Sequence, residues 1–171
     1  INQQLSKLGY EVKFFNLKER NIAPCTGCDY CFEQEVGVCC KQDGMQEIYP
    51  ELANSELYIF VTPISFGGFN SDLKKAIDRF MPLILPTYTI HKGELHHPLR
   101  YNNPNKLTTI GILKEDFKEQ EATFKLVSKR LEKAFFLSRA VTVVAKETAD
   151  NILLEKRIKE GINEMGCRID G

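Results

Sequence analysis

Residues 57–62, LYIFVT, decide the fold of this chain. A continuous apolar run of this length, rich in β-branched and aromatic residues, predicts a strand that is covered on both faces of a parallel sheet. A loop with proline and glycine follows over residues 63–69 (PISFGGF), and Asn70 or Ser71 then provides the N-cap of a helix. That helix has one apolar face, formed by Leu73, Ala76, Ile77 and Phe80. The segment therefore predicts a strand–loop–helix unit of an α/β fold.

The same alternation extends along the chain in both directions. Strands are predicted over residues 12–17 (VKFFNL), 107–113 (LTTIGIL) and 141–144 (VTVV), with helices before, between and after them. In the helix that follows the first strand, Asp43 is the predicted cap and Pro50 the predicted end, near Tyr49. The order, without an internal repeat or a linker, predicts a single domain over residues 1–171 built on a doubly wound parallel sheet.

Three loops are candidates for binding. Doubly wound sheets bind ligands at the carboxyl ends of their strands, and the loops 20–42 and 63–70 both follow predicted strands. Residues 82–105 hold four of the seven prolines and all three histidines without any periodicity, so this stretch is predicted to be a lid or a binding loop.

The composition excludes several classes of protein. The 171 residues are 43% apolar and 27% charged, which is typical of a globular domain with a full-sized core. Lys+Arg and Asp+Glu number 23 each, so the chain has no basic surplus for nucleic acid or an anionic membrane. No apolar run approaches the length of a membrane span, and the first twenty residues are too polar for a signal peptide, so we expect a cytoplasmic protein.

The first chemical motif is a cluster of cysteines. Two residues separate each of Cys25, Cys28 and Cys31 from the next, and Cys39 follows after seven more, with Cys40 as an alternative fourth member. Bacterial ferredoxins open with a similar run, whereas zinc sites more often consist of two separate pairs. The pattern leaves three interpretations open. The first is an iron–sulfur cluster, the second is zinc or a redox disulfide, and the third is a loop of reduced thiols.

The second motif is the loop that follows the 57–62 strand. A strand end, a proline-fixed turn and two glycines allow the backbone to approach a flat ring closely, and Ile64, Phe66 and Phe69 could pack on that ring. A tight turn without a ligand has the same pattern, so the motif alone does not separate the two interpretations.

Together these segments resemble the NAD(P)H-dependent FMN reductases of the flavodoxin superfamily, and within them the iron–sulfur flavoproteins. The resemblance runs from about Gly9 to Phe80 and rests on several short motifs in the right order. These are Pro24-Cys25-x-x-Cys28-x-x-Cys31, Gly37-x-Cys39, Asp43-x-Met45, Thr62-Pro63-Ile64 and Asp72-Leu73-Lys74-x-x-x-Asp78-Arg79. Position 65 is often Tyr in this family and is Ser here.

The resemblance implies a flavodoxin-like sheet of order 2-1-3-4-5 with FMN across the strand ends. The flavin would face Thr62, Pro63, Ile64, Ser65, Phe66, Gly67 and Gly68, and Gly111 with the loop after its strand would flank it. Cys25, Cys28, Cys31 and Cys39 would hold a [4Fe-4S] cluster near the flavin. Family members commonly dimerise, so a homodimer is expected.

One part of the implied fold is not found in the sequence. The Ser/Gly-rich loop that holds the phosphate of FMN, and the central first strand before it, have no counterpart, and residues 1–9 resemble the end of the first helix. We expect that the sequence is a fragment, or that another segment or subunit supplies the strand.

The functional prediction is an FMN-dependent oxidoreductase that uses NAD(P)H to reduce a small acceptor, such as free flavin, a quinone or a redox protein. No side chain needs to act as a catalytic proton donor, because the cofactor carries the chemistry. Two alternatives stay open: an electron-transfer flavoprotein without NAD(P)H turnover, and a cysteine-loop module that binds zinc or senses thiols on a flavodoxin scaffold.

Overall fold

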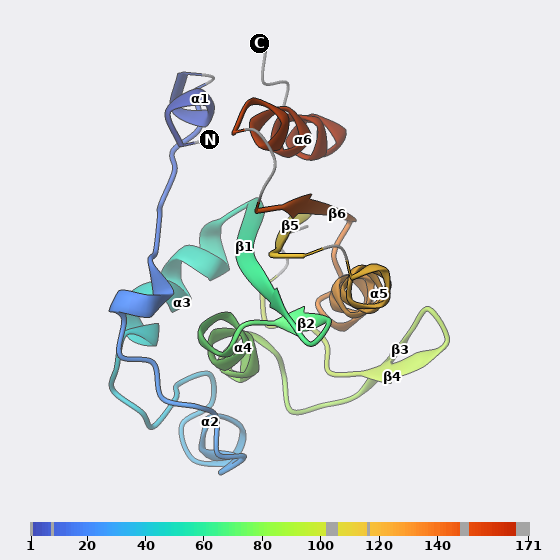
Figure 1. Cartoon of the computed structure of the whole chain (residues 1–171). Coiled ribbons are helices and arrows are strands. Elements are labelled where there is room, and N and C mark those ends of the chain that lie inside the picture. The colour runs from blue at the N-terminus through green and yellow to red at the C-terminus, as the bar shows by residue number, and fades with distance from the viewer. Residues whose placement is uncertain (1, 8, 102–105, 116, 148–150, 167–171) are drawn as a thin grey trace.

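The structure, a computed structural model, describes all residues except 1, 8, 102–105, 116, 148–150 and 167–171. Its centre is a four-stranded sheet of order β2-β1-β5-β6, formed by β1 (Leu57–Ser65), β2 (Gly68–Phe69), β5 (Lys106–Leu113) and β6 (Arg139–Lys146). β5 lies between β1 and β6 and is parallel to both, whereas β2 is antiparallel to β1 (Figure 1). The predicted strands 57–62, 107–113 and 141–144 are thus confirmed, each with some added length.

Helices cover both faces of this sheet (Figure 1). On one face, α1 (Asn2–Lys7) and α6 (Asn151–Glu164) pack through Leu5, Ile158 and Ile162 against Ile110 of β5. On the other face lie α3 (Met45–Asn54), α4 (Ser71–Asp78) and α5 (Lys118–Ala134), which bury Ile48, Leu73 and Leu131 among others. The α/β class and the doubly wound arrangement of helices are therefore confirmed.

The prediction of a strand at residues 12–17 is wrong. Residues 11–16 form no regular element, and Leu17–Glu19 form the short 3-10 helix η1. A strand exists only where a neighbouring strand pairs with it, and no described strand lies beside this segment. Phe14 is 70% exposed in consequence.

The predicted order 2-1-3-4-5 is confirmed only for the three parallel strands β1, β5 and β6, which occupy its positions 3, 4 and 5. On the side of β1 away from β5, the one described strand is β2, which pairs only with Ile64 and Ser65. The prediction that a central strand lies outside this sequence stays a prediction.

Two local predictions are corrected by the structure. Pro50 lies inside α3, which continues to Asn54 because Ile48 and Leu52 are buried against the sheet side of the helix. Residues 63–69 are not a simple loop, since β1 runs through Ser65 and a two-residue turn at Phe66–Gly67 leads into β2. The cap at Asn70 is confirmed, because its Oδ1 accepts the backbone N–H of Leu73 at 3.1 Å.

The proline-rich stretch 82–105 has structure of its own over its described residues, which end at Tyr101. It begins with η2 (Met81–Leu83) and contains an antiparallel hairpin of β3 (Thr89–His91) and β4 (Glu94–His96). Ion pairs from Glu94 to Arg130 and Lys133, and from Lys92 to Glu132, hold this hairpin against α5.

No described helix has the length and apolar character needed to cross a membrane.

Candidate functional site

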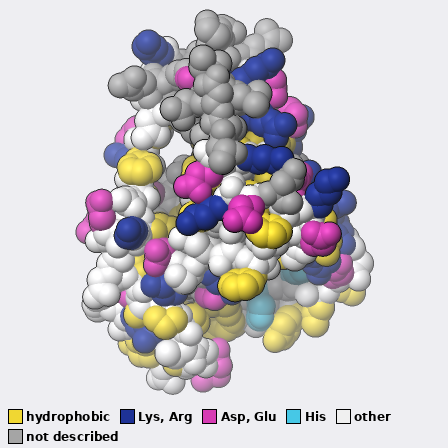
Figure 2. All heavy atoms as spheres, viewed as in Figure 1, with side chains coloured by type: hydrophobic (Ala, Val, Ile, Leu, Met, Phe, Trp, Pro, Cys, Tyr) yellow, Lys and Arg dark blue, Asp and Glu magenta, His cyan; other side chains and the backbone are white. Residues whose placement is uncertain are grey.

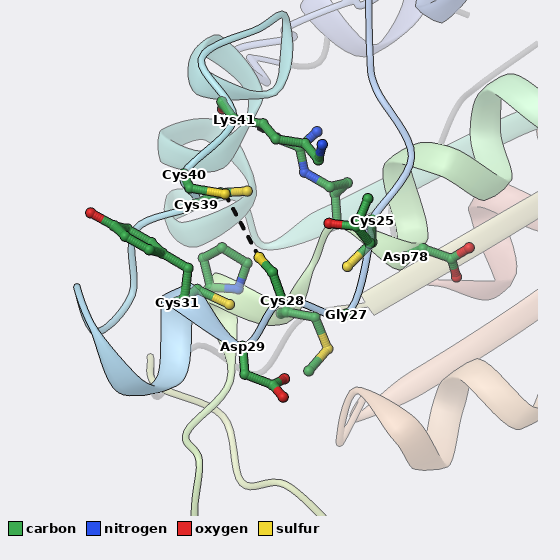
Figure 3. Close-up of a pocket in the computed structure, with 14 residues that line it drawn as sticks. Cys25, Gly27, Cys28, Asp29, Cys31, Cys39, Cys40, Lys41 and Asp78 are labelled. Carbon is green, nitrogen blue, oxygen red and sulfur yellow. Dashed lines mark hydrogen bonds between the residues drawn. The ribbon is translucent and has the colours of Figure 1, made fainter.

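Five cysteine side chains line one cavity. The cavity has a volume of about 300 Å³ and lies between α2 (Tyr30–Glu33), the loop before α3 and the end of α4. The five cysteines share its lining with charged residues and with several others: Lys41, Arg79, Asp29 and Asp78, and Thr26, Gly27, Tyr30, Met81 and Pro82 (Figure 3). All five cysteines are free thiols; Cys167 lies outside the described residues. The structure therefore brings together the four predicted ligands and the alternative fourth member.

A buried ion pair holds the cysteine loop in place. Arg79, at the end of α4, is 1% exposed and donates to both carboxylate oxygens of Asp43, at 2.8 and 3.2 Å. The same guanidinium donates to the carbonyl of Ala23 at 2.8 Å. Asp43 in turn accepts the backbone N–H groups of Ala23 and Met45, both at 3.0 Å. Residues on both sides of the cysteines are thus tied to one side chain of α4.

The electrostatics of this pair follow from its contacts. Burial would raise the pKa of Asp43, but the hydrogen bonds from Arg79, Ala23 and Met45 outweigh it and lower that pKa. Tyr49 donates to the carbonyl of Arg79 at 2.9 Å, and burial raises the pKa of Tyr49. The buried Nε of Arg79 has no hydrogen-bond partner within the protein.

The thiols around the cavity influence one another. The sulfurs of Cys28 and Cys40 are 3.7 Å apart. A hydrogen bond from the backbone of Tyr30, and then the Cys40 thiol, lower the pKa of Cys28, while the contact with Cys28 raises the pKa of Cys40. Burial, followed by the neighbouring charge of Cys39, raises the pKa of Cys31. Metal ligation requires deprotonated thiols, so a cationic iron core would counteract the burial that raises the pKa of Cys31 and the thiol contact that raises the pKa of Cys40.

The metal-ligating side chains that the cysteine loop gathers at this cavity are mainly thiols. Among the described residues, no three His, Cys, Asp or Glu side chains are placed to share one metal ion. The thiols instead surround a cavity, and thiolates are the donors that iron–sulfur clusters require. Four thiolates are also a donor set that zinc accepts, so the residues at this cavity fit either group.

The predicted flavin loop forms the end of β1 and the turn after it. Thr62 is 1% exposed; its hydroxyl accepts the backbone N–H of Asn70 at 3.1 Å and lies 2.9 Å from the carbonyl of Pro63, so it joins β1 to the start of α4. Phe66 and Gly67 both have positive φ, at 49° and 76°, as a two-residue hairpin turn requires. Phe66 is 96% exposed, which leaves its aromatic ring free for a ligand.

Gly111, the other predicted flavin contact, lies inside β5, paired with Thr62. A Cβ at this position would be 2.4 Å from Cε1 of Phe124 and 2.7 Å from Cδ1 of Ile64. The close packing of α5 on the sheet is thus sufficient to explain why position 111 is a glycine.

The two predicted sites are neighbours but do not share a cavity. None of Thr62–Gly68 or Gly111 lines the cysteine cavity. Helix α4 links them, because it begins next to the β1–β2 hairpin at Ser71 and ends beside the cysteines at Asp78. Eight helical residues span about 12 Å.

The three histidines divide between two places. His97 lines a second cavity, of about 330 Å³, where its ring is 5.2 Å from that of Phe32 and 4.5 Å from that of Tyr88. His91 and His96 face Phe136 and lie outside both cavities. Only His97 is therefore close to the cysteine loop.

Comparison with known families decides which family this architecture represents. The model of the NADPH-dependent FMN reductase family matches residues 1–97, more than half of the chain. The chain belongs to the NADPH-dependent FMN reductase family. The match includes the cysteine loop and the β1–β2 hairpin, so the resemblance seen in the sequence is confirmed.

Several relatives in this family carry the name iron–sulfur flavoprotein. One from Archaeoglobus fulgidus is 31% identical over 93 residues, which cover 54% of this chain and 47% of the relative. One from Methanocaldococcus jannaschii is 30% identical over 91 residues, covering 53% and 46%. One from Methanosarcina thermophila is 30% identical over 71 residues, covering 42% and 36%. The matched region thus spans less than half the length of each of these relatives.

Sequence reasoning missed the importance of Arg79 and Asp43. Both residues belong to the motifs that resemble the FMN reductase family, but a charged Asp78-Arg79 step at a helix end is typically solvated. Only the three-dimensional structure shows that Arg79 turns inward, whereas Asp78 stays exposed and pairs with Lys74. In the family motifs Asp43 follows three positions after the last cysteine of the loop. That order is the one sequence signal that could have indicated an ion pair between Asp43 and Arg79.

Proposed function

We propose that the protein is an FMN-dependent oxidoreductase that uses NAD(P)H to reduce a small acceptor, such as free flavin, a quinone or a redox protein. We include in the proposal a [4Fe-4S] cluster held by Cys25, Cys28, Cys31 and Cys39. The observation that carries it is the set of cysteine thiols around one cavity in a chain of the FMN reductase family. The name of the relatives, iron–sulfur flavoprotein, supports the same combination of cofactors.

The flavin would lie against the β1–β2 hairpin, at the carboxyl end of the parallel strands. When bound, FMN accepts a hydride from NAD(P)H and passes electrons to the acceptor. The exposed ring of Phe66 would pack on the flavin ring, and the backbone of Gly67 and Gly68 would approach it without obstruction from side chains. The protein's own contribution is therefore binding and orientation.

The cysteine cavity would hold the cluster one helix length from the hairpin. Lys41 lines that cavity, and its positive charge would favour the negative charge of a thiolate-ligated cluster. Arg79 and Asp43 keep the two ends of the loop fixed, so that the thiols face inward without a ligand present.

An anaerobic absorbance titration with FMN tests the flavin. We expect bound-flavin bands with the wild-type chain and about tenfold weaker binding for Phe66→Ala, because the ring-on-ring contact is lost. Leu126→Ala, at another exposed apolar side chain, on α5, is the matched control and should bind FMN as the wild type does. A chain that binds no FMN would refute the flavin assignment.

Reconstitution with ferrous iron and sulfide tests the cluster. We expect a broad brown absorbance that dithionite bleaches, lost in Cys31→Ser and retained in Cys40→Ser. Loss in Cys40→Ser with retention in Cys39→Ser would contradict the proposed ligand set. Steady-state oxidation of NADH and NADPH then tests turnover, since a loaded chain without oxidation would be an electron carrier instead.

A further inference from the structure

Two thiols in the cysteine cavity that the ligand motif does not join are in contact. Cys28 belongs to the first run and Cys40 lies beyond the predicted fourth ligand, yet their sulfurs are 3.7 Å apart. Figure 3 shows the two side chains pointing toward one another across the cavity, joined by the dashed line. Twelve positions separate the two residues, so the contact depends on the folded loop rather than on their spacing in sequence.

The fold holds this pair in place from both sides. Cys28 directly precedes Asp29, whose φ of 53° turns the chain into α2, and the carbonyl of Asp29 accepts N–H groups of Phe32 and Glu33. On the other side, the carbonyl of Lys41, the residue after Cys40, accepts a hydrogen bond from the side chain of Gln46 at 2.9 Å. Both cysteines are exposed, so a soluble reagent reaches them without unfolding the loop.

We propose that Cys28 and Cys40 form a redox-active dithiol pair that closes to an intramolecular disulfide when a low-molecular-weight disulfide acts as the oxidant. This goes beyond the proposed flavin and cluster chemistry, because it requires only the thiols of the chain. Since a cysteine in a disulfide has no thiolate to offer a metal, the disulfide and a cluster that uses Cys28 exclude one another.

The reaction is a double thiol–disulfide exchange. One thiolate of the pair attacks a sulfur of the oxidant, breaks its S–S bond and releases one small thiolate, which leaves a mixed disulfide. The other thiol loses its proton to solvent, and its sulfur attacks the protein sulfur of the mixed disulfide and expels the second small thiolate. The protein loses two hydrogens, and the oxidant is reduced to two small thiols.

The experiment is disulfide mapping of the 171-residue chain. The chain is reduced, purified anaerobically without added iron, treated with oxidised glutathione and alkylated. Trypsin cleavage alone leaves all five cysteines in residues 21–41, so cleavage after glutamate is added to separate residues 21–33 from residues 36–41. Cleavage before Asp29 then separates Cys25 and Cys28 from Cys31. We expect one link per chain, between residues 21–28 and 36–41.

Matched variants identify the two partners of that link. Cys40→Ser and Cys28→Ser should abolish it, while Cys39→Ser and Cys25→Ser should retain it at the wild-type yield. The proposal is overturned if the wild-type chain gives only glutathione adducts or a link within residues 21–33, or if Cys39→Ser abolishes the link and Cys40→Ser keeps it. The wild-type map needs no variant to fold, and it gives its answer whether or not the chain binds FMN, because iron is removed with a chelator before the oxidant is added.

Discussion

At the scale of single residues, the Arg79–Asp43 pair explains how a loop with no strand of its own keeps five thiols around one cavity. An arginine that is 1% exposed needs its charge matched inside the protein, and Asp43 provides the matching charge at 2.8 Å. A buried ion pair contributes little more to the stability of a protein than well-packed apolar side chains would, but removing one member leaves the other charge buried and uncompensated. The loop geometry therefore depends on both residues being present and ionised.

Asp43→Asn should destabilise the protein by about 3 kcal/mol at neutral pH, because Arg79 loses its counter-charge. The folded state lowers the pKa of Asp43, so its stabilising contribution is complete above the unfolded value of about 3.9 and is lost as the pH falls through the lower folded value. The difference in the free energy of unfolding between wild type and variant should thus shrink below about pH 4. Urea denaturation at a series of pH values measures this difference.

Asp78→Asn is the matched control for this change. Asp78 is the neighbour of Arg79 and also lines the cavity, but its ion pair with Lys74 is exposed. The control should cost under about 1 kcal/mol at every pH. An equal loss of stability in Asp43→Asn and Asp78→Asn would show that the buried ion pair contributes no more than the exposed one.

At the scale of elements, the approach of α5 to the sheet is set by Gly111 and Phe124. Phe124 is fully buried and occupies the space where a Cβ on Gly111 would lie. This contact brings the start of α5 close to the β1–β2 hairpin, where Thr123 lies against Gly67. A change at Gly111 therefore acts first on helix packing.

Gly111→Ala should destabilise the protein by about 2 kcal/mol, because the new methyl group overpacks the contact with Phe124 and Ile64. Adding Phe124→Leu should recover part of this loss, as coupled neighbours do. Gly68→Ala is the control, since its Cβ would meet only the carbonyl of Ser65 at an ordinary 3.5 Å. Thermal unfolding compares the variants, and an unchanged midpoint for Gly111→Ala would contradict the packing argument.

The elements also show what sequence can and cannot predict. The strand at 57–62 and the cap at Asn70 were predictable because an apolar, β-branched run and a capping side chain are local signals. The expected burial of that strand on both faces is wrong, since Thr62 is its one buried residue within 57–62 and Val61 is 52% exposed. The absence of a strand at 12–17 was not predictable, because a strand forms only beside a partner strand that its own residues do not encode. Pro50 indicated a helix end, but burial of Ile48 and Leu52 carries α3 past it.

The candidate site divides in the same way. The cysteine spacing indicated that these thiols lie close together, since three of them follow at regular short intervals, and their role as ligands stays a prediction. It gave no indication that the sulfurs of Cys28 and Cys40 are in contact, because that contact depends on how the whole loop folds. Nor did it show that Arg79 is buried, since burial of a charge depends on residues more than thirty positions away.

At the scale of the whole molecule, surface charge offers no barrier to self-association. The formal net charge is zero at pH 7, and Figure 2 shows charges of both signs mixed over the visible face. Hydrophobic side chains gather at the lower right of that view, where Figure 1 places the β3–β4 hairpin. Its cross-strand partners Ile90 and Leu95 are 77% and 66% exposed.

The predicted homodimer can be tested on this hairpin. Its inner face is fixed to α5 by ion pairs, so substitutions on the outer face leave the fold intact. Ile90→Lys with Leu95→Lys should shift a dimer to monomer in sedimentation velocity, because two charges would be buried against an apolar surface. Val36→Lys with Leu126→Lys adds the same charge at two other exposed apolar positions and should leave the dimer in place. Equal dissociation in both double variants would attribute association to the low net charge, and a dimer that survives the hairpin substitutions would exclude this face.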